Sequence, residues 1–176
     1  DLSNLVSDPY VICKKLALEG FIIIFLQPKV TDPFDILKPN ITKNIILSKE
    51  QQKIFNQINE SENIFRPFLL HGVTGSGKTE VYMKLAQKII KKGKSVLVLV
   101  PEIALTPQIA NRFNLVFGNQ IALWHSHMTK SEKGWTWQQI KKGNYSIIIG
   151  ARSAIFTPIK KLRLIILFNL ETFPPS

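Results

Sequence analysis

The stretch Gly72-Val73-Thr74-Gly75-Ser76-Gly77-Lys78-Thr79 decides the fold class of this chain. It matches throughout the pattern Gly-x-x-x-x-Gly-Lys-Ser/Thr, the P-loop that cradles nucleotide phosphates. Its glycines let backbone N–H groups turn toward an anion, and the helix predicted to follow adds its positive end. Lys78 is placed to reach the β- and γ-phosphates, and the Thr79 hydroxyl to bind Mg²⁺. By itself the pattern does not separate kinases, GTPases and motor proteins.

Strands and helices alternate from residue 47 onward, which predicts an α/β fold with a parallel sheet and helices on both faces. A short strand is expected just before the P-loop, at Phe68–His71. Four more apolar strands are predicted at Ser95–Val100, Ile121–Trp124, Ser146–Ile149 and Leu162–Leu167. Helices are predicted at Lys78–Lys92, from Pro107 to Phe117 with Thr106 as the N-cap, and around Trp137.

Gln51 precedes the first strand and allows two interpretations. Ser48 and Gln51 have the spacing of a capping box at the start of a helix. Alternatively, Gln51 contacts an adenine from outside the P-loop. One side chain does not easily do both, and the sequence leaves the choice open.

The composition favours a polyanionic partner. Lys and Arg number 23 against 12 Asp and Glu, a net charge of +11, which fits nucleic acid. A lysine-rich composition imposed by an AT-rich genome is the alternative. Lysines also cluster around the helix that follows the P-loop. The ordinary interpretation of such a cluster is a solvated helix face, and the alternative is a surface that binds DNA. The lysines are Lys84, Lys88, Lys91, Lys92 and Lys94.

Other features restrict the protein class. The single cysteine, Cys13, excludes a cysteine-cluster zinc site and an internal disulfide, and it fits a reducing cytoplasm. The longest apolar run, Phe21–Leu26, is far shorter than the roughly 18–20 residues of a membrane-spanning helix, so no membrane association is expected.

Two further motifs follow the carboxyl ends of predicted strands, where open α/β sheets bind ligands. They are Pro101–Gln108 and Gly150–Phe156. Together with His71–Tyr82, they closely resemble the PriA family of replication-restart DNA helicases, which belongs to superfamily 2. The resemblance covers roughly residues 47–167.

The resemblance implies a RecA-like P-loop NTPase lobe that binds ATP and Mg²⁺, with Gln51 at the adenine. It implies a 3′-to-5′ motor on forked or branched DNA, with primosome and single-strand-binding proteins as partners. The implied DNA contacts are Thr106, Gln108, Arg152 and Ser153. The Thr106 hydroxyl can donate a hydrogen bond to a phosphate oxygen, and Arg152 can bind phosphate oxygens in bidentate fashion.

The domain organisation is predicted by the same resemblance. Residues 1–30 are expected to be the remnant of a small winged-helix domain, 31–46 a linker, 47–167 the first motor lobe, and 168–176 an aberrant tail. The family's acidic box, Asp-Glu-Glu-His, is replaced by Phe168-Asn169-Leu170-Glu171. A truncated lobe with no intact catalytic residues is therefore expected, which binds ATP and DNA weakly without hydrolysis. The alternatives are a small P-loop phosphotransferase and a non-enzymatic basic DNA-binding module.

Overall fold

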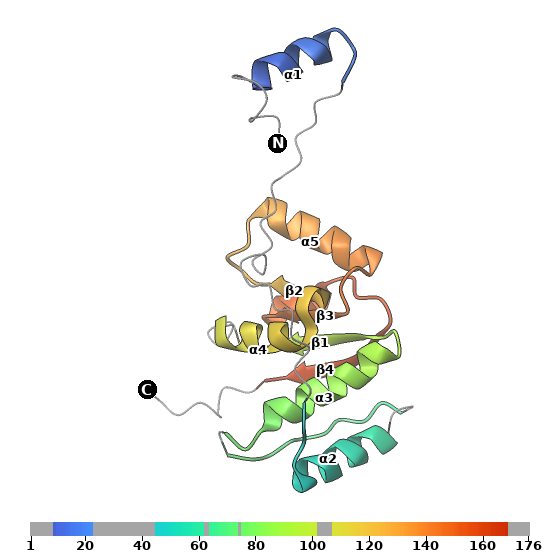
Figure 1. Ribbon diagram of the computed structural model, residues 1–176. Coiled ribbons are helices and arrows are strands. Elements are labelled where there is room, and N and C mark those ends of the chain that lie inside the picture. Colours follow the sequence, from blue (N-terminus) through green and yellow to red (C-terminus); the bar gives the residue numbers. More distant parts are fainter. Residues whose placement is uncertain (1–8, 23–44, 62–63, 74, 102–106, 169–176) are drawn as a thin grey trace. The chain divides into compact units, whose positions relative to one another are not determined.

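The computed structural model describes residues 9–22, 45–61, 64–73, 75–101 and 107–168 (Figure 1). The chain divides into two units, residues 1–30 and 31–176. The first unit contains helix α1 (Pro9–Leu18). Most of the run Phe21–Leu26 and the linker up to residue 44 lie outside the described residues, so the winged-helix assignment stays a prediction.

The second unit is built on a parallel sheet, which confirms the predicted fold class. Its strands lie in the order β2-β3-β1-β4, and every neighbouring pair is parallel. The amino ends of the strands therefore share one edge of the sheet and their carboxyl ends share the other. The strands are β1 (Ser95–Leu99), β2 (Ile121–Trp124), β3 (Ile147–Gly150) and β4 (Leu162–Leu167).

Helices cover both faces of the sheet, as expected (Figure 1). Alternate strand residues such as Val96 and Ile149 pack in the main core with α3 (Lys78–Lys91) and α4 (Pro107–Phe117). Their neighbours, such as Leu97 and Ile148, pack on the other face with Ile140 of α5 (Lys130–Lys142) and Ala154 of the 3₁₀ turn η4 (Arg152–Phe156). A second turn, η3 (Gly118–Gln120), leads into β2.

The strand predicted at Phe68–His71 is wrong. This segment has no regular secondary structure, and Leu69 is 93% exposed. A strand needs a neighbour for its backbone hydrogen bonds. Among the described strands, β4 pairs only with β1, and none pairs with the other side of β4. The segment before the P-loop therefore forms no ladder with β4, whose outer side stays open among the described strands.

Candidate nucleotide site

The P-loop lies at the start of α3 and depends on its glycines. Gly75 and Gly77 have φ values of +81° and +80°, in the left-handed region that favours glycine, and Gly77 is the N-cap of α3. A Cβ at Gly77 would also overlap the side-chain amide of Gln51. Glycine conformations of this kind form anion-binding concavities, and the N-terminus of α3 adds its positive end. Thr74 lies outside the described residues.

Lys78 folds back over the loop that precedes it. Its ammonium donates hydrogen bonds to the carbonyl oxygens of Gly72 and, at 2.9 Å, of Val73. Ser76 N–H donates to the Val73 carbonyl at 3.2 Å, which closes the turn. Thr79 follows on the first turn of α3 and is half-buried. A lysine, a threonine hydroxyl and a helix N-terminus form a donor set that fits nucleotide phosphates with Mg²⁺.

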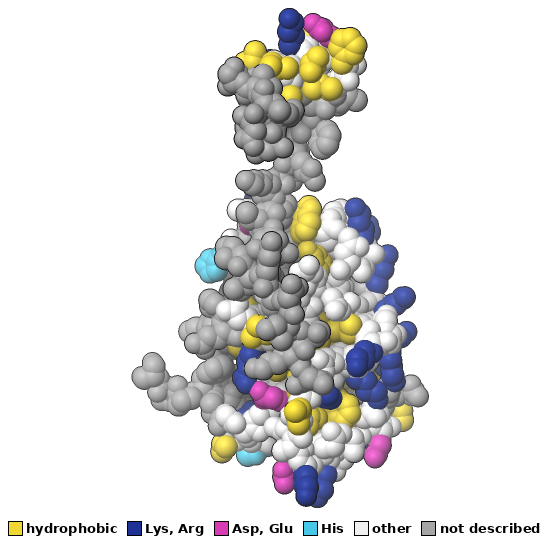
Figure 2. Space-filling view, viewed as in Figure 1, with side chains coloured by type: hydrophobic (Ala, Val, Ile, Leu, Met, Phe, Trp, Pro, Cys, Tyr) yellow, Lys and Arg dark blue, Asp and Glu magenta, His cyan; other side chains and the backbone are white. Residues whose placement is uncertain are grey.

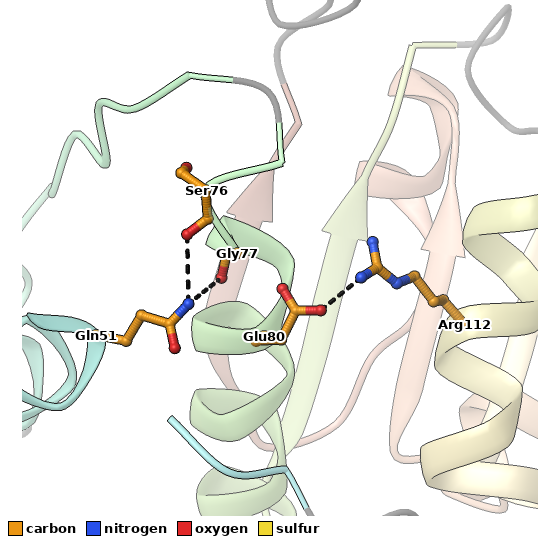
Figure 3. Close-up of polar contacts among 5 residues, drawn as sticks. All are labelled: Gln51, Ser76, Gly77, Glu80 and Arg112. Carbon is orange, nitrogen blue, oxygen red and sulfur yellow. Dashed lines mark hydrogen bonds and ion pairs between the residues drawn. The ribbon is translucent and has the colours of Figure 1, made fainter. Parts of the chain in front are cut away.

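Gln51 completes the predicted capping box and also contacts the P-loop (Figure 3), while its contact to an adenine stays a prediction. Its Oε1 accepts a hydrogen bond from Ser48 N–H at 2.8 Å, which completes the capping box of helix α2 (Lys49–Glu60). Its Nε2 donates to the carbonyl oxygens of Ser76 and Gly77, each at 3.3 Å. The two ends of one amide thus join the start of α2 to the P-loop. The contact to the loop, rather than to an adenine, is what the described residues contain.

Sequence reasoning missed an ion pair beside the P-loop (Figure 3). Glu80, two residues after Lys78, accepts a hydrogen bond from Nη2 of Arg112 on α4 at 2.5 Å. Glu80 was part of a quoted motif, but its partner lies 32 residues away and no local spacing connects the two. The pair links the P-loop helix to the helix that follows the Pro101–Gln108 motif.

The carboxyl end of β4 is apolar at Phe168, where the family resemblance would place the first residue of an acidic box. Phe168 N–H donates to the Leu99 carbonyl at 2.9 Å. Its ring lies edge-on to Tyr82 of α3 and to Phe113 of α4, at centroid distances of 5.3 and 6.5 Å. Burial raises the pKa of the Tyr82 hydroxyl. Residues 169–171 lie outside the described part of the chain.

The predicted DNA-contacting residues fall on different elements. Arg152 and Ser153 are exposed on η4, just past the carboxyl end of β3. Gly150 fixes that position: a Cβ there would overlap the carbonyl oxygen of Trp124 and lie 2.7 Å from the Cβ of Ala154. Thr106 and the side chain of Gln108 lie outside the described residues, so their placement stays a prediction.

Among the described residues, no group of three or more His, Cys, Asp or Glu side chains could hold a metal ion. None of the helices in those ranges is long and apolar enough to cross a membrane.

Comparison with known proteins defines the class. A family model described as DEAD/DEAH box helicase matches residues 48–171. The chain belongs to this family of helicases.

Within that class, the chain is similar to replication restart protein PriA, which confirms the resemblance seen in the sequence. PriA of Bacillus subtilis (strain 168) is 41% identical over 156 residues, which are 88% of this chain and 19% of that protein. PriA of Synechocystis sp. is 56% identical over 103 residues, 58% of this chain and 12% of that protein. PriA of Haemophilus influenzae is 44% identical over 128 residues, 73% of this chain and 17% of that protein. The chain thus spans about a fifth or less of the length of these relatives.

A solved structure was also matched, that of the UvsW helicase from bacteriophage T4. It has a TM-score of 0.47 at 19% identity and covers 82% of this chain and 53% of that one. Because both the TM-score and the identity are low, this match adds nothing to the strand order and helix packing described above.

Proposed function

We propose that residues 47–167 are the ATP-binding lobe of a DNA motor that acts in replication restart. The observation that carries the proposal is the bond of Gln51 to the P-loop carbonyls of Ser76 and Gly77. This bond joins Gln51, a residue outside the loop, to the loop that would hold the phosphates. The family resemblance assigns the adenine contact to the same residue, Gln51. In this proposal the loop amides and Lys78 hold the ATP phosphates, and the Thr79 hydroxyl binds Mg²⁺.

DNA is the proposed substrate of the motor, bound along the carboxyl edge of the sheet. Arg152 and Ser153 are exposed there, and a guanidinium binds phosphate oxygens in bidentate fashion. Thr106 and Gln108 would contribute from the segment before α4. Forked or branched DNA, primosome proteins and single-strand-binding proteins are the partners that the likeness to PriA supports, in the cytoplasm.

The same proposal holds that this chain binds ATP without hydrolysing it. Phe168 ends β4 among the rings of Tyr82 and Phe113, where the family resemblance puts the first residue of an acidic box. A phenyl ring neither binds Mg²⁺ nor orients an attacking water. Binding energy from the P-loop would then be retained while the chemical step is lost.

Nucleotide binding is tested by titrating the 176-residue chain with a fluorescent ATP analogue in the presence of Mg²⁺. Lys78→Ala is expected to abolish binding, whereas Lys91→Ala, which removes an exposed lysine from the same helix, is expected to leave it unchanged. Equal affinity of wild type and Lys78→Ala would show that the site is wrong. Phosphate release in a DNA-stimulated assay would instead contradict only the claim of no hydrolysis.

A further inference from the structure

Eight basic side chains lie at the amino edge of the sheet, opposite the carboxyl edge that holds the predicted DNA contacts. We call this group the basic edge. Three segments supply it: the end of α3, the end of α5, and the approach to β4. All eight are exposed; they are Lys91, Lys92, Lys94, Lys141, Lys142, Lys160, Lys161 and Arg163.

Backbone hydrogen bonds bring the three segments together. Ser95 N–H at the start of β1 donates to the carbonyl of Lys161 at 3.1 Å. Val96 N–H donates to the carbonyl of Ser146, which follows the end of α5, at 2.9 Å. Figure 2 shows dark-blue side chains gathered along the right-hand side of the second unit, the side on which α3 and α5 end in Figure 1.

No described carboxylate belongs to these three segments. Glu80 and Glu132 lie in the first turns of α3 and α5, at the opposite ends of those helices. Glu80 is paired with Arg112, and Glu132 is held by the N–H of Thr129 at 2.7 Å. Of the other described carboxylates, Glu50 and Glu60 are on α2, and Glu19 belongs to the first unit. The three segments therefore carry eight basic side chains and no described carboxylate of their own.

A solvated face explains part of the basic edge. Lysines in the last turns of α3 and α5 are favourable next to the negative ends of those helices. That reason does not extend to Lys94, Lys160, Lys161 and Arg163, which lie outside the helices. Lys161 is also the one described non-glycine residue with a positive φ, at 56°. Glycine or asparagine would adopt that backbone more easily, so lysine occupies the position at a conformational cost.

From these observations we infer that the basic edge is a second nucleic-acid surface, which binds the phosphate backbone without reading sequence. Rows of exposed lysines on several elements are typical of backbone binding, and they need no base contacts. A membrane-binding surface combines lysines with large apolar side chains that insert into lipid. At this edge the described residues offer Leu162, at 40% exposure, as a large apolar side chain between Lys161 and Arg163. DNA bound here would lie on the opposite edge from η4 and from the P-loop.

The test measures the affinity of the full chain for a fluorescent oligonucleotide by anisotropy at several salt concentrations. The test variant carries Lys94→Gln, Lys142→Gln, Lys160→Gln and Lys161→Gln. Because each phosphate contact adds about 0.7–0.9 to the salt slope, losing four contacts should lower the slope by about 3 and the affinity at low salt by about 10-fold or more. A variant with arginine at the same four positions should keep the wild-type slope.

A matched control removes the same charge elsewhere, with Lys14→Gln, Lys49→Gln, Lys53→Gln and Lys130→Gln, all exposed positions. It should bind much more tightly than the test variant. Equal losses in both variants, or no loss in the test variant, would overturn the inference in favour of total charge. Tighter binding to phosphatidylserine vesicles than to DNA at equal salt would overturn it in favour of a membrane.

The inference is separable from the proposed function. Binding at the basic edge should not depend on ATP, and Lys78→Ala should leave it intact. If Lys78→Ala loses nucleotide binding while the basic-edge variant binds DNA normally, the inference fails and the proposed function stands.

Discussion

Glu80 and Arg112 form an ion pair of 2.5 Å between the first turn of α3 and the middle of α4. The carboxylate side chain is 28% exposed and the guanidinium 55%, so water screens the pair. The pair matters because of where it lies. It joins α3, which begins at the P-loop, to α4, which follows a predicted DNA-contacting segment.

The strength of this pair is expected to be small. In a double-mutant cycle with Glu80→Gln and Arg112→Gln, the coupling free energy should be about 0.2–1 kcal/mol and should decrease with salt. Urea denaturation of the four proteins measures it. A coupling of zero at low salt would mean that the pair does not hold the two helices together in solution.

The two roles of Gln51 can be separated by substitution. In Gln51→Glu, a carboxylate oxygen can still accept from Ser48 N–H, but the donor to the carbonyls of Ser76 and Gly77 is lost. Nucleotide affinity should therefore decrease several-fold while the free energy of unfolding changes little. Ser48→Ala should do the reverse and cost about 1 kcal/mol of stability through the lost cap. If both variants change only the nucleotide affinity, or both change only the free energy of unfolding, the two ends of the Gln51 amide do not have separate roles.

Two glycines of the second unit should respond to alanine with opposite signs. At Gly150 the new Cβ would overlap the Trp124 carbonyl oxygen and crowd Ala154, so Gly150→Ala should destabilise by about 3 kcal/mol. Gly134 lies within α5 with nothing within 4 Å of an added Cβ, so Gly134→Ala should stabilise by about 0.5–1 kcal/mol. Thermal unfolding followed by circular dichroism gives both signs, and a stable Gly150→Ala would contradict the close approach of β2 and η4.

The exposed face of β4 should limit solubility. Ile165 and Leu167 are 46% and 70% exposed on the same face of an edge strand, which favours pairing with another chain. Substituting both with lysine should raise the concentration at which the chain aggregates and leave its melting temperature almost unchanged. Light scattering is the measurement. Ile166→Ala, on the buried face, is the contrasting variant and should cost about 2–5 kcal/mol.

The parallel sheet, its alternating helices and the P-loop were predictable from the sequence because each depends on local periodicity or a complete motif. The boundaries of β2 and β4 agree with the predictions for Ile121–Trp124 and Leu162–Leu167. The strand at Phe68–His71 was not predictable in this way, since an apolar run becomes a strand only beside a suitable neighbour. The Gln51 bridge and the Glu80–Arg112 pair depend on how helices pack, which no local pattern encodes.

The place of Phe168 links residue 168 to two helices. Its ring is part of the contact between α3 and α4, through Tyr82 and Phe113. An aspartate at position 168 would put a carboxylate against two aromatic rings, where it loses solvation and gains no partner from them. A design that places an acidic side chain there would therefore have to change residues 82 and 113 together with residue 168.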